Sequence, residues 1–228
     1  MQSTLSPLPQ TWLQRWHPGA SLGAIMALTM TLLLVELILV PDANLFFKEG
    51  YGVERVTVVL YALALVLWWA ARPPRGSWQI PLLLLLMALR ELDFDKRFTE
   101  VGLLKLQYYL RPAPITDKLV GIVLLLVIAV AVWRVLRYNL GPWLRGLAAR
   151  RADAWLVFVA CGCVFIAKTI DGMDRKLAGF GVVFSQKVLI RAGRIEEVLE
   201  LVFVLLVCLA IALFAHRDDR AGQGTIRR

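Results

Sequence analysis

The stretch LVGIVLLLVIAVAVW, residues 119–133, decides the fold, because none of its residues is charged. A second run, IPLLLLLMAL at residues 80–89, has the same character. Apolar residues make up 59% of the 228-residue chain and charged residues 19%, against about half and about a quarter in soluble domains. In hydrocarbon such segments are stable only as helices that satisfy their own backbone hydrogen bonds. Together with a mean hydropathy of +0.66, they predict a polytopic, all-α membrane protein.

Six segments approach the length of about 20 residues that one membrane span requires. They lie at residues 20–40, 53–71, 78–93, 118–136, 154–169 and 195–215. We therefore expect a six-helix transmembrane bundle built of helical hairpins, forming a single domain over residues 1–228. The first segment is too long for the apolar part of a cleavable signal peptide, so we expect it to remain as an anchor. Amphipathic stretches at residues 98–110 and 177–190 predict short interfacial helices on one face of the membrane.

The charged residues divide unequally between the two membrane faces that this threading defines. Side A holds both termini and the segments at residues 72–77 and 134–151, and side B holds the other connections. Side A has twelve basic residues, all arginine, and three acidic ones, whereas side B has fourteen of each, so the formal net charge of +9 lies on side A. Arginines that flank spans without acidic partners favour the cytoplasmic face. We expect a bacterial inner-membrane protein with both termini in the cytoplasm.

This topology also explains the basic character of the chain without a nucleic-acid partner. Neither stacking aromatic residues nor a nucleic-acid-binding motif accompanies the arginines. The eight tryptophans lie near the ends of the predicted spans, as in the aromatic belts of membrane proteins. Membrane lipid is therefore the partner that the sequence predicts, and the sequence does not specify an oligomeric state.

The third and fifth predicted spans end in similar charge patterns. RELDFDKRF at residues 90–98 and KTIDGMDRKL at residues 168–177 both read basic-x-x-Asp. In both, a second Asp, two basic residues and a large apolar residue follow, with one insertion in the later copy. We interpret this as a helical hairpin repeated in the same direction. Inverted repeats around a midplane site are typical of secondary transporters, so a parallel repeat weakens that function class.

Two charged triplets within this echo have a spacing that places them on one helical face, because positions i, i+3 and i+7 lie on one stripe. The triplets are Arg90, Asp93 and Arg97, and Lys168, Asp171 and Arg175. Each would place one carboxylate between two cations. Paired charges at helix ends can also simply neutralise one another and anchor loops, and that structural interpretation remains open.

The last predicted span adds further carboxylates. Glu196 and Glu200 are four residues apart and share a face, and Glu200 lies deeper, where a lone charge in hydrocarbon is costly. The number and depth of the acids on side B exceed what the solubility of the loops requires. Our candidate acid–base residues are Glu91, Asp93, Asp171, Glu196 and Glu200.

The remaining residue types limit the chemistry on side B. His17 and His216 lie outside the spans on side A, which excludes a histidine-based zinc site or a serine triad near the acids. Clustered carboxylates could instead hold Mg²⁺, Mn²⁺ or Ca²⁺. The candidate metal ligands are Glu91, Asp93, Asp171 and Glu196. Basic side chains beside the acids could bind an anionic group. These candidates are Arg90, Arg97, Lys168 and Arg175.

These residues favour an integral membrane enzyme, a hydrolase or transferase, that acts on a lipid or lipid-linked anionic substrate at the non-cytoplasmic interface. Two alternatives remain. A transporter or an ion- or proton-conducting protein would use the same acidic cluster, and a non-catalytic assembly partner would use the charged face as an interface. Acids that converge beside a cavity open to lipid would favour the enzyme, whereas a polar path across the bilayer would favour transport.

Overall fold

The computed structural model describes residues 11–48, 50–74, 76–92, 94, 108 and 114–226. Every regular element in this part of the chain is a helix. In chain order the helices are α1 (Trp12–Arg15), α2 (Pro18–Leu39), α3 (Ala43–Phe46), α4 (Gly52–Ala70), α5 (Gln79–Glu91), α7 (Ile115–Arg134), the π-helix η1 (Val135–Asn139), α8 (Leu140–Ala148), α9 (Ala152–Ile170), α10 (Met173–Ala178) and α11 (Gln186–Ile226).

Five helical segments are long and apolar enough to cross a membrane, which confirms the polytopic all-α class. They are Pro18–Leu39, Gly52–Ala70, Ile115–Ala148, Ala152–Ile170 and Gln186–Arg217. The third predicted span, residues 78–93, becomes α5 with 13 residues. At 1.5 Å per residue α5 is about 20 Å long, shorter than the hydrocarbon core of about 30 Å. Among the described residues, five helical segments are therefore long enough to span the membrane, and α5, the third predicted span, is shorter.

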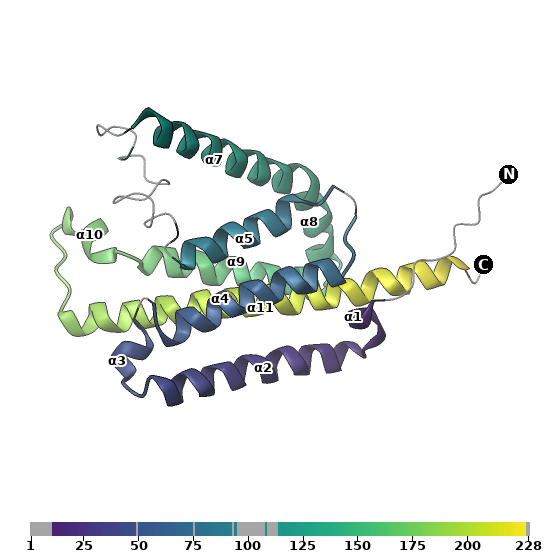
Figure 1. Ribbon diagram of the computed structural model, residues 1–228, viewed down its shortest axis with the longest axis horizontal. Helices are drawn as coiled ribbons and strands as arrows, with labels where there is room; N and C mark the ends of the chain where they lie inside the picture. Colours follow the sequence, from purple (N-terminus) through teal and green to yellow (C-terminus); the bar gives the residue numbers. More distant parts are fainter. Residues whose placement is uncertain are drawn as a thin grey trace.

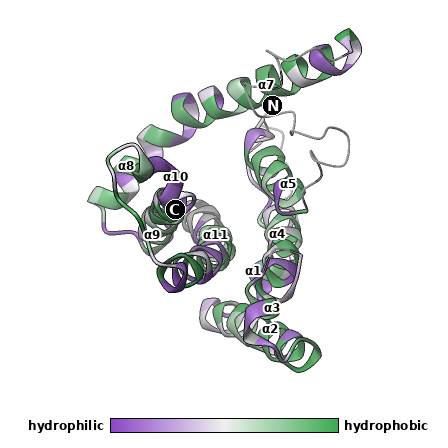
Figure 2. Ribbon diagram, turned by 90° about the vertical axis from the view of Figure 1, so that its left-hand side faces the viewer, coloured by the Kyte–Doolittle hydropathy of each residue, from purple (hydrophilic) through white to green (hydrophobic). Residues whose placement is uncertain are grey.

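The long helices run back and forth, so that α1 and the last turns of α11 lie at the same end of the bundle (Figure 1). This end is side A, and side B is the opposite end, where α3 and α10 lie (Figure 1). Apolar residues cover much of the helices in Figure 2, as expected for surfaces that face lipid. The order of the predicted crossings is therefore that of the structure.

Helix α11 is the centre of the bundle and contacts α2, α4 and α9. Its buried side chains include Val204 and Cys208, which face Leu60 and Ala64 of α4 in one apolar core. The Cys208 thiol donates a hydrogen bond to the carbonyl oxygen of Leu60 at 3.4 Å. The buried residues of α9 are all alanine, namely Ala154, Ala160 and Ala167. Small side chains allow membrane helices to approach closely, which explains the extensive contact between α9 and α11.

Helix α7 is attached to the bundle far less than α11 is. Only Gly121 and Ala131 of α7 are buried, and most of its other side chains are exposed on surfaces that would face lipid. The π-helix η1 follows α7 and leads into α8, which turns across the side A end toward α9 (Figure 1). There the Trp143 indole Nε1 donates a hydrogen bond to the carbonyl oxygen of Ala154 at 3.0 Å.

The interfacial helices predicted for side B are a partial correction. The stretch at residues 98–110 lies outside the described residues except for residue 108. The stretch at residues 177–190 is not one surface helix: α10 ends at Ala178, residues 182–185 have no regular structure, and α11 begins at Gln186. Helix α11 thus starts nine residues before the predicted span and is 41 residues long, because its polar first turns extend the apolar helix toward side B.

Candidate functional site

Three helices bring ionisable side chains together on side B. Helix α5 ends with Arg90 and Glu91, and α9 carries Lys168 in its last turn. Helix α11 passes both ends and presents three glutamates over little more than one turn, Glu196, Glu197 and Glu200. We call these six residues the side B cluster.

Glu200 is the most enclosed member, with only 11% of its side chain exposed. The Lys168 ammonium lies 2.6 Å from Glu200 Oε1, and one guanidinium nitrogen of Arg90 lies 3.9 Å from the same oxygen. The Lys168 ammonium also donates a hydrogen bond to Glu196 Oε1 at 3.3 Å. Lys168 therefore bridges two carboxylates one helical turn apart. Glu200 is paired with two cations, one from α9 and one from α5.

Arg90 and Lys168 are the first residues of the two echoed sequence patterns, RELDFDKRF and KTIDGMDRKL. In the structure both point to one carboxylate on α11. The charge pattern that suggested a repeat thus supplies two converging cations, although the repeat itself remains a prediction.

Further acids and a phenol lie around Glu200 and its two cations, Lys168 and Arg90. Glu91 and Glu197 lie close enough to interact electrostatically with Glu200, and both also interact with Glu54 at the start of α4. Below them Tyr61 of α4 is 1% exposed and lies within electrostatic range of Glu91, Glu200 and Arg90. Its ring lies 6.5 Å from that of Phe203 on α11. Carboxylates and a phenol are side chains that can accept and donate protons, so the site is suited to acid–base chemistry.

The other predicted site residues lie at its edge. Asp171 is the residue that follows α9, and it interacts electrostatically with Glu196. The Lys176 ammonium donates hydrogen bonds to the carbonyl oxygens of Lys168, at 2.7 Å, and of Asp171, at 2.6 Å. These bonds fold α10 back over the end of α9.

Arg175 is exposed on α10, and its guanidinium lies beside Gly172. Gly172 has a φ of +59°, a conformation that favours glycine at this turn. Arg175 makes none of the described contacts with the side B cluster. Asp93 and Arg97 lie outside the described residues, so the first predicted triplet is described only at Arg90.

Sequence reasoning missed two residues of this site. Glu197 is flanked by the predicted acids Glu196 and Glu200, but the helical spacing rule that selected those two gave it no role. Tyr61 lies in the apolar run of α4, seven residues after Glu54. A tyrosine in such a run has no distinctive pattern, and only the packing of α4 against α11 reveals its position.

The described residues do not form a cluster of metal ligands. Within them, no three acidic, histidine or cysteine side chains are arranged as ligands of one ion. Glu196 is instead paired with Lys168. The candidate ligands Glu91, Asp171 and Glu196 are therefore better described as members or neighbours of an ion-pair cluster, and the metal prediction stays a prediction.

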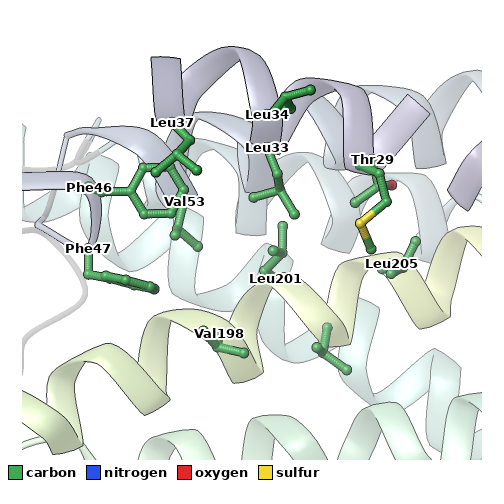
Figure 3. Close-up of a pocket in the computed structure, with 12 residues that line it drawn as sticks. Thr29, Leu33, Leu34, Leu37, Phe46, Phe47, Val53, Val198, Leu201 and Leu205 are labelled. Atoms are coloured by element: carbon green, nitrogen blue, oxygen red, sulfur yellow. The ribbon is translucent and has the colours of Figure 1, made fainter. Parts of the chain in front are cut away.

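An apolar groove of about 490 Å³ lies on another face of α11, between α11 and α2 (Figure 3). Leu33 of α2 points toward Leu201 of α11, and Phe46 and Phe47 lie at the side B end of the groove (Figure 3). Groove side chains such as Leu34, which is 58% exposed, open it to the surrounding lipid. The bundle thus has a charged site and a lipid-facing groove at similar depth on side B.

Side A carries a separate set of polar contacts. Asp153 pairs with Arg151 and with Arg217, the latter at 3.0 Å, and joins the start of α9 to α11. Ser21 of α2 and His216 of α11, both buried, form a hydrogen bond of 3.1 Å. These contacts connect helix ends and lie at the opposite end of the bundle from Glu200.

The fold and the site together define a polytopic α-helical membrane protein with a partly buried ion-pair cluster near one membrane face. No protein family, curated protein or solved structure matches the chain. The geometry of the side B cluster therefore carries the functional argument.

Proposed function

We propose that this protein is an integral membrane enzyme, a hydrolase or transferase, that acts on a lipid or lipid-linked substrate at side B. Glu200 is the central acid–base residue, and Lys168 and Arg90 bind an anionic group of the substrate. The observation that carries this proposal is the enclosure of Glu200, 11% exposed, between cations from α9 and α5. Glu91 and Glu196 are the neighbouring carboxylates that complete the proposed site.

The cost of placing charges at this depth supports a functional role. An ionisable side chain at the centre of a membrane helix costs about 2.5–3.5 kcal/mol on insertion scales, and the cost falls toward the interface. Ionisable residues in membrane helices commonly mark functional sites. Replacement of a buried ion pair by apolar side chains is often neutral or stabilising, so stability alone does not require the cluster. Three helices nevertheless direct ionisable groups to Glu200.

The contacts suggest how a substrate would engage the site. The Lys168 ammonium has three N–H donors, which it directs toward Glu196 and Glu200. An anionic substrate group would compete with these carboxylates for Lys168 and for the Arg90 guanidinium. A Glu200 carboxylate released in this way could accept a proton from the reacting group or return one to it.

The interior of the bundle favours chemistry at the interface over conduction across the bilayer. Between the side B cluster and side A, the α4 and α11 contact consists of buried apolar side chains, including Leu60, Ala64, Val204 and Ile211. Among the described residues, the polar groups on side A are separated from Glu200 by this core. A polar path across the bilayer would be the arrangement expected of a transporter.

Cation or proton binding is the second candidate function, and the charge of the site favours it. Within the described part of the side B cluster, four carboxylates accompany two cations. Such an excess attracts cations. A flux assay in proteoliposomes separates the two functions, because a transporter would move ions or protons across the vesicle membrane in the absence of any lipid conversion.

The enzyme proposal is tested with purified protein in nanodiscs that contain a total bacterial lipid extract. Mass spectrometry over time would detect a lipid whose amount falls and a product whose amount rises. Glu200→Gln removes the acid–base group while it preserves shape, and we expect turnover to fall about 10²- to 10⁴-fold. Asp153→Asn is the matched control, because Asp153 is an enclosed, ion-paired carboxylate at the other end of the bundle. Equal turnover in wild type and Glu200→Gln would refute the proposal.

We also propose that the protein resides in a bacterial inner membrane with side A in the cytoplasm. Arginines without acidic partners at the span ends of side A support this orientation. Ser185→Cys and Ala149→Cys add exposed thiols on side B and side A respectively. In a background with the three native cysteines replaced, a membrane-impermeant maleimide added to intact cells should label only the first variant. Labelling of Ala149→Cys alone would show that side A faces the outside of the cell.

A further inference from the structure

The groove between α2 and α11 shares its α11 stripe with an arginine. Val198, Leu201 and Leu205 line the groove at the spacing i, i+3 and i+7. Arg194 lies four residues before Val198 and therefore one turn closer to side B on the same stripe. The face of α11 that lines the apolar groove thus carries a guanidinium, that of Arg194, at its side B end.

The groove has the dimensions and chemistry of an acyl-chain site. Its α2 wall extends from Thr29 to Leu37, eight residues or about 12 Å along the helix axis. Thr29 is the one polar residue among those that line it, and its hydroxyl donates to the carbonyl oxygen of Ile25 at 2.9 Å, which turns the donor into the helix. The walls therefore present apolar surface to an occupant.

The Arg194 guanidinium is held in place at the side B end. One of its terminal nitrogens donates a hydrogen bond to Asn44 Oδ1 of α3 at 2.8 Å. The guanidinium carbon lies 5.7 Å from the ring centroid of Phe47, and Phe47 itself lines the groove. Helix α3 is fixed in turn by Asp42, whose carboxylate accepts the Asn44 backbone N–H at 2.8 Å. A guanidinium has five N–H donors, so the Asn44 bond leaves others for an anion.

The charges around this end favour an anion over a cation. The nearby carboxylates have partners of their own. Glu36 is paired with Arg55 at 3.6 Å, and Asp42 and Glu54 accept backbone N–H groups. Arg194, by contrast, is hydrogen-bonded to the neutral Asn44 and lies within ion-pair distance of no carboxylate among the described residues. An arginine donor pair matches the geometry of a phosphate.

We propose that this groove binds one anionic glycerophospholipid, with an acyl chain between α2 and α11 and the phosphate on Arg194. The site lies on a different face of α11 from the side B cluster and does not rest on the proposed chemistry of Glu200. A bound lipid would add contacts among α2, α3 and α11 to those that α2 and α11 already make.

The experiment is native mass spectrometry of the purified protein titrated with phosphatidylglycerol or phosphatidylcholine of identical acyl chains. Wild type is expected to bind phosphatidylglycerol more tightly. Arg194→Gln should weaken phosphatidylglycerol binding about tenfold, which corresponds to the loss of one charged hydrogen-bonding group. Phosphatidylcholine binding should weaken less, because the choline ammonium offsets the charge of its phosphate. Arg145→Gln is the control, because Arg145 is an exposed arginine of α8 at the opposite end of the bundle.

A second pair of variants tests the acyl-chain half of the site. Val198→Trp fills the groove and should weaken binding of both lipids, whereas Val120→Trp on the lipid-exposed face of α7 should not. Thermal unfolding of each variant verifies that it is folded. If Arg194→Gln does not fold, Arg194→Lys, which keeps the charge but loses the planar fork, should show a smaller loss of phosphatidylglycerol affinity. Equal wild-type affinity for the two lipids, equal losses in Arg145→Gln and Arg194→Gln, or no effect of Val198→Trp would overturn the proposal.

Discussion

The two hairpins that carry the echoed charge pattern, α5 with α7 and α9 with α11, differ strongly in how their helices pack. Helices α9 and α11 contact each other along their lengths, and all three buried residues of α9 are alanine. Helix α7 buries only Gly121 and Ala131, and most of its other side chains are exposed to lipid. Apolar side chains gain little by burial when the solvent is itself hydrocarbon. Close helix association therefore depends on small side chains and polar contacts, not on hydrophobicity.

The same difference appears in the two cations that meet at Glu200. Lys168, from the tightly packed hairpin, lies 2.6 Å from Glu200 and also reaches Glu196. Arg90, from the loosely packed hairpin, lies 3.9 Å away, and half of its side chain is exposed. The more closely packed hairpin thus supplies the cation that lies closer to the central carboxylate.

The first prediction concerns the stability lost when each of these two cations is replaced. Lys168→Met leaves Glu196 and Glu200 without their closest partner. Breaking a fully buried pair costs about 3–5 kcal/mol, and because Lys168 is 32% exposed we expect about 3 kcal/mol of lost stability. Arg90→Met should cost less than about 1 kcal/mol. Unfolding by SDS titration in mixed micelles measures both, and equal losses would contradict the difference between the hairpins.

The packing of the helices themselves gives the second prediction. Ala160→Leu inserts a larger side chain at a fully buried position of α9, and overpacking there should destabilise the protein by about 1–3 kcal/mol. Ala129→Leu makes the same change on an exposed position of α7 and should stay within about 0.5 kcal/mol of wild type. The same SDS titration compares them. A loss in Ala129→Leu as large as that in Ala160→Leu would show that α7 packs against a partner surface.

The third prediction concerns the polar contacts that attach α7 to α5 on side A. The Gln79 side chain, 2% exposed, donates to Asn139 Oδ1 at 3.0 Å and accepts from Arg134 Nε at 3.4 Å. Arg134 also donates to the carbonyl oxygen of Gly76 at 2.8 Å. Gln79→Ala should cost about 1 kcal/mol in stability and broaden the α5–α7 distance distribution measured by spin-label spectroscopy. Gln186→Ala, at the exposed start of α11, is the control, and an unchanged distribution in Gln79→Ala would show that apolar contact alone holds α7.

Several features of the fold and site could be predicted from the sequence. Charge-free runs predicted the helices, and the spacing of Glu196 and Glu200 correctly placed both on the face that meets Lys168. Arg90 and Lys168, which the sequence analysis selected as anion-binding candidates, both approach Glu200, whereas the repeat itself stays a prediction. By contrast, α5 is shorter than its predicted span, and α11 begins earlier than predicted, because helix ends depend on local turns and not on hydropathy alone.

By itself, the sequence determined the membrane class, the all-α fold and the concentration of acids on side B. The physical reason is local: an uncharged run of about 20 residues is stable in lipid only as a helix, and charges must then collect at helix ends. Only the tertiary structure decided that α11 is the central helix, that Arg90 and Lys168 share Glu200, and that Arg194 stands at the end of an apolar groove. Each of these depends on which small or polar side chains face one another across helices far apart in sequence, and no local pattern encodes that choice.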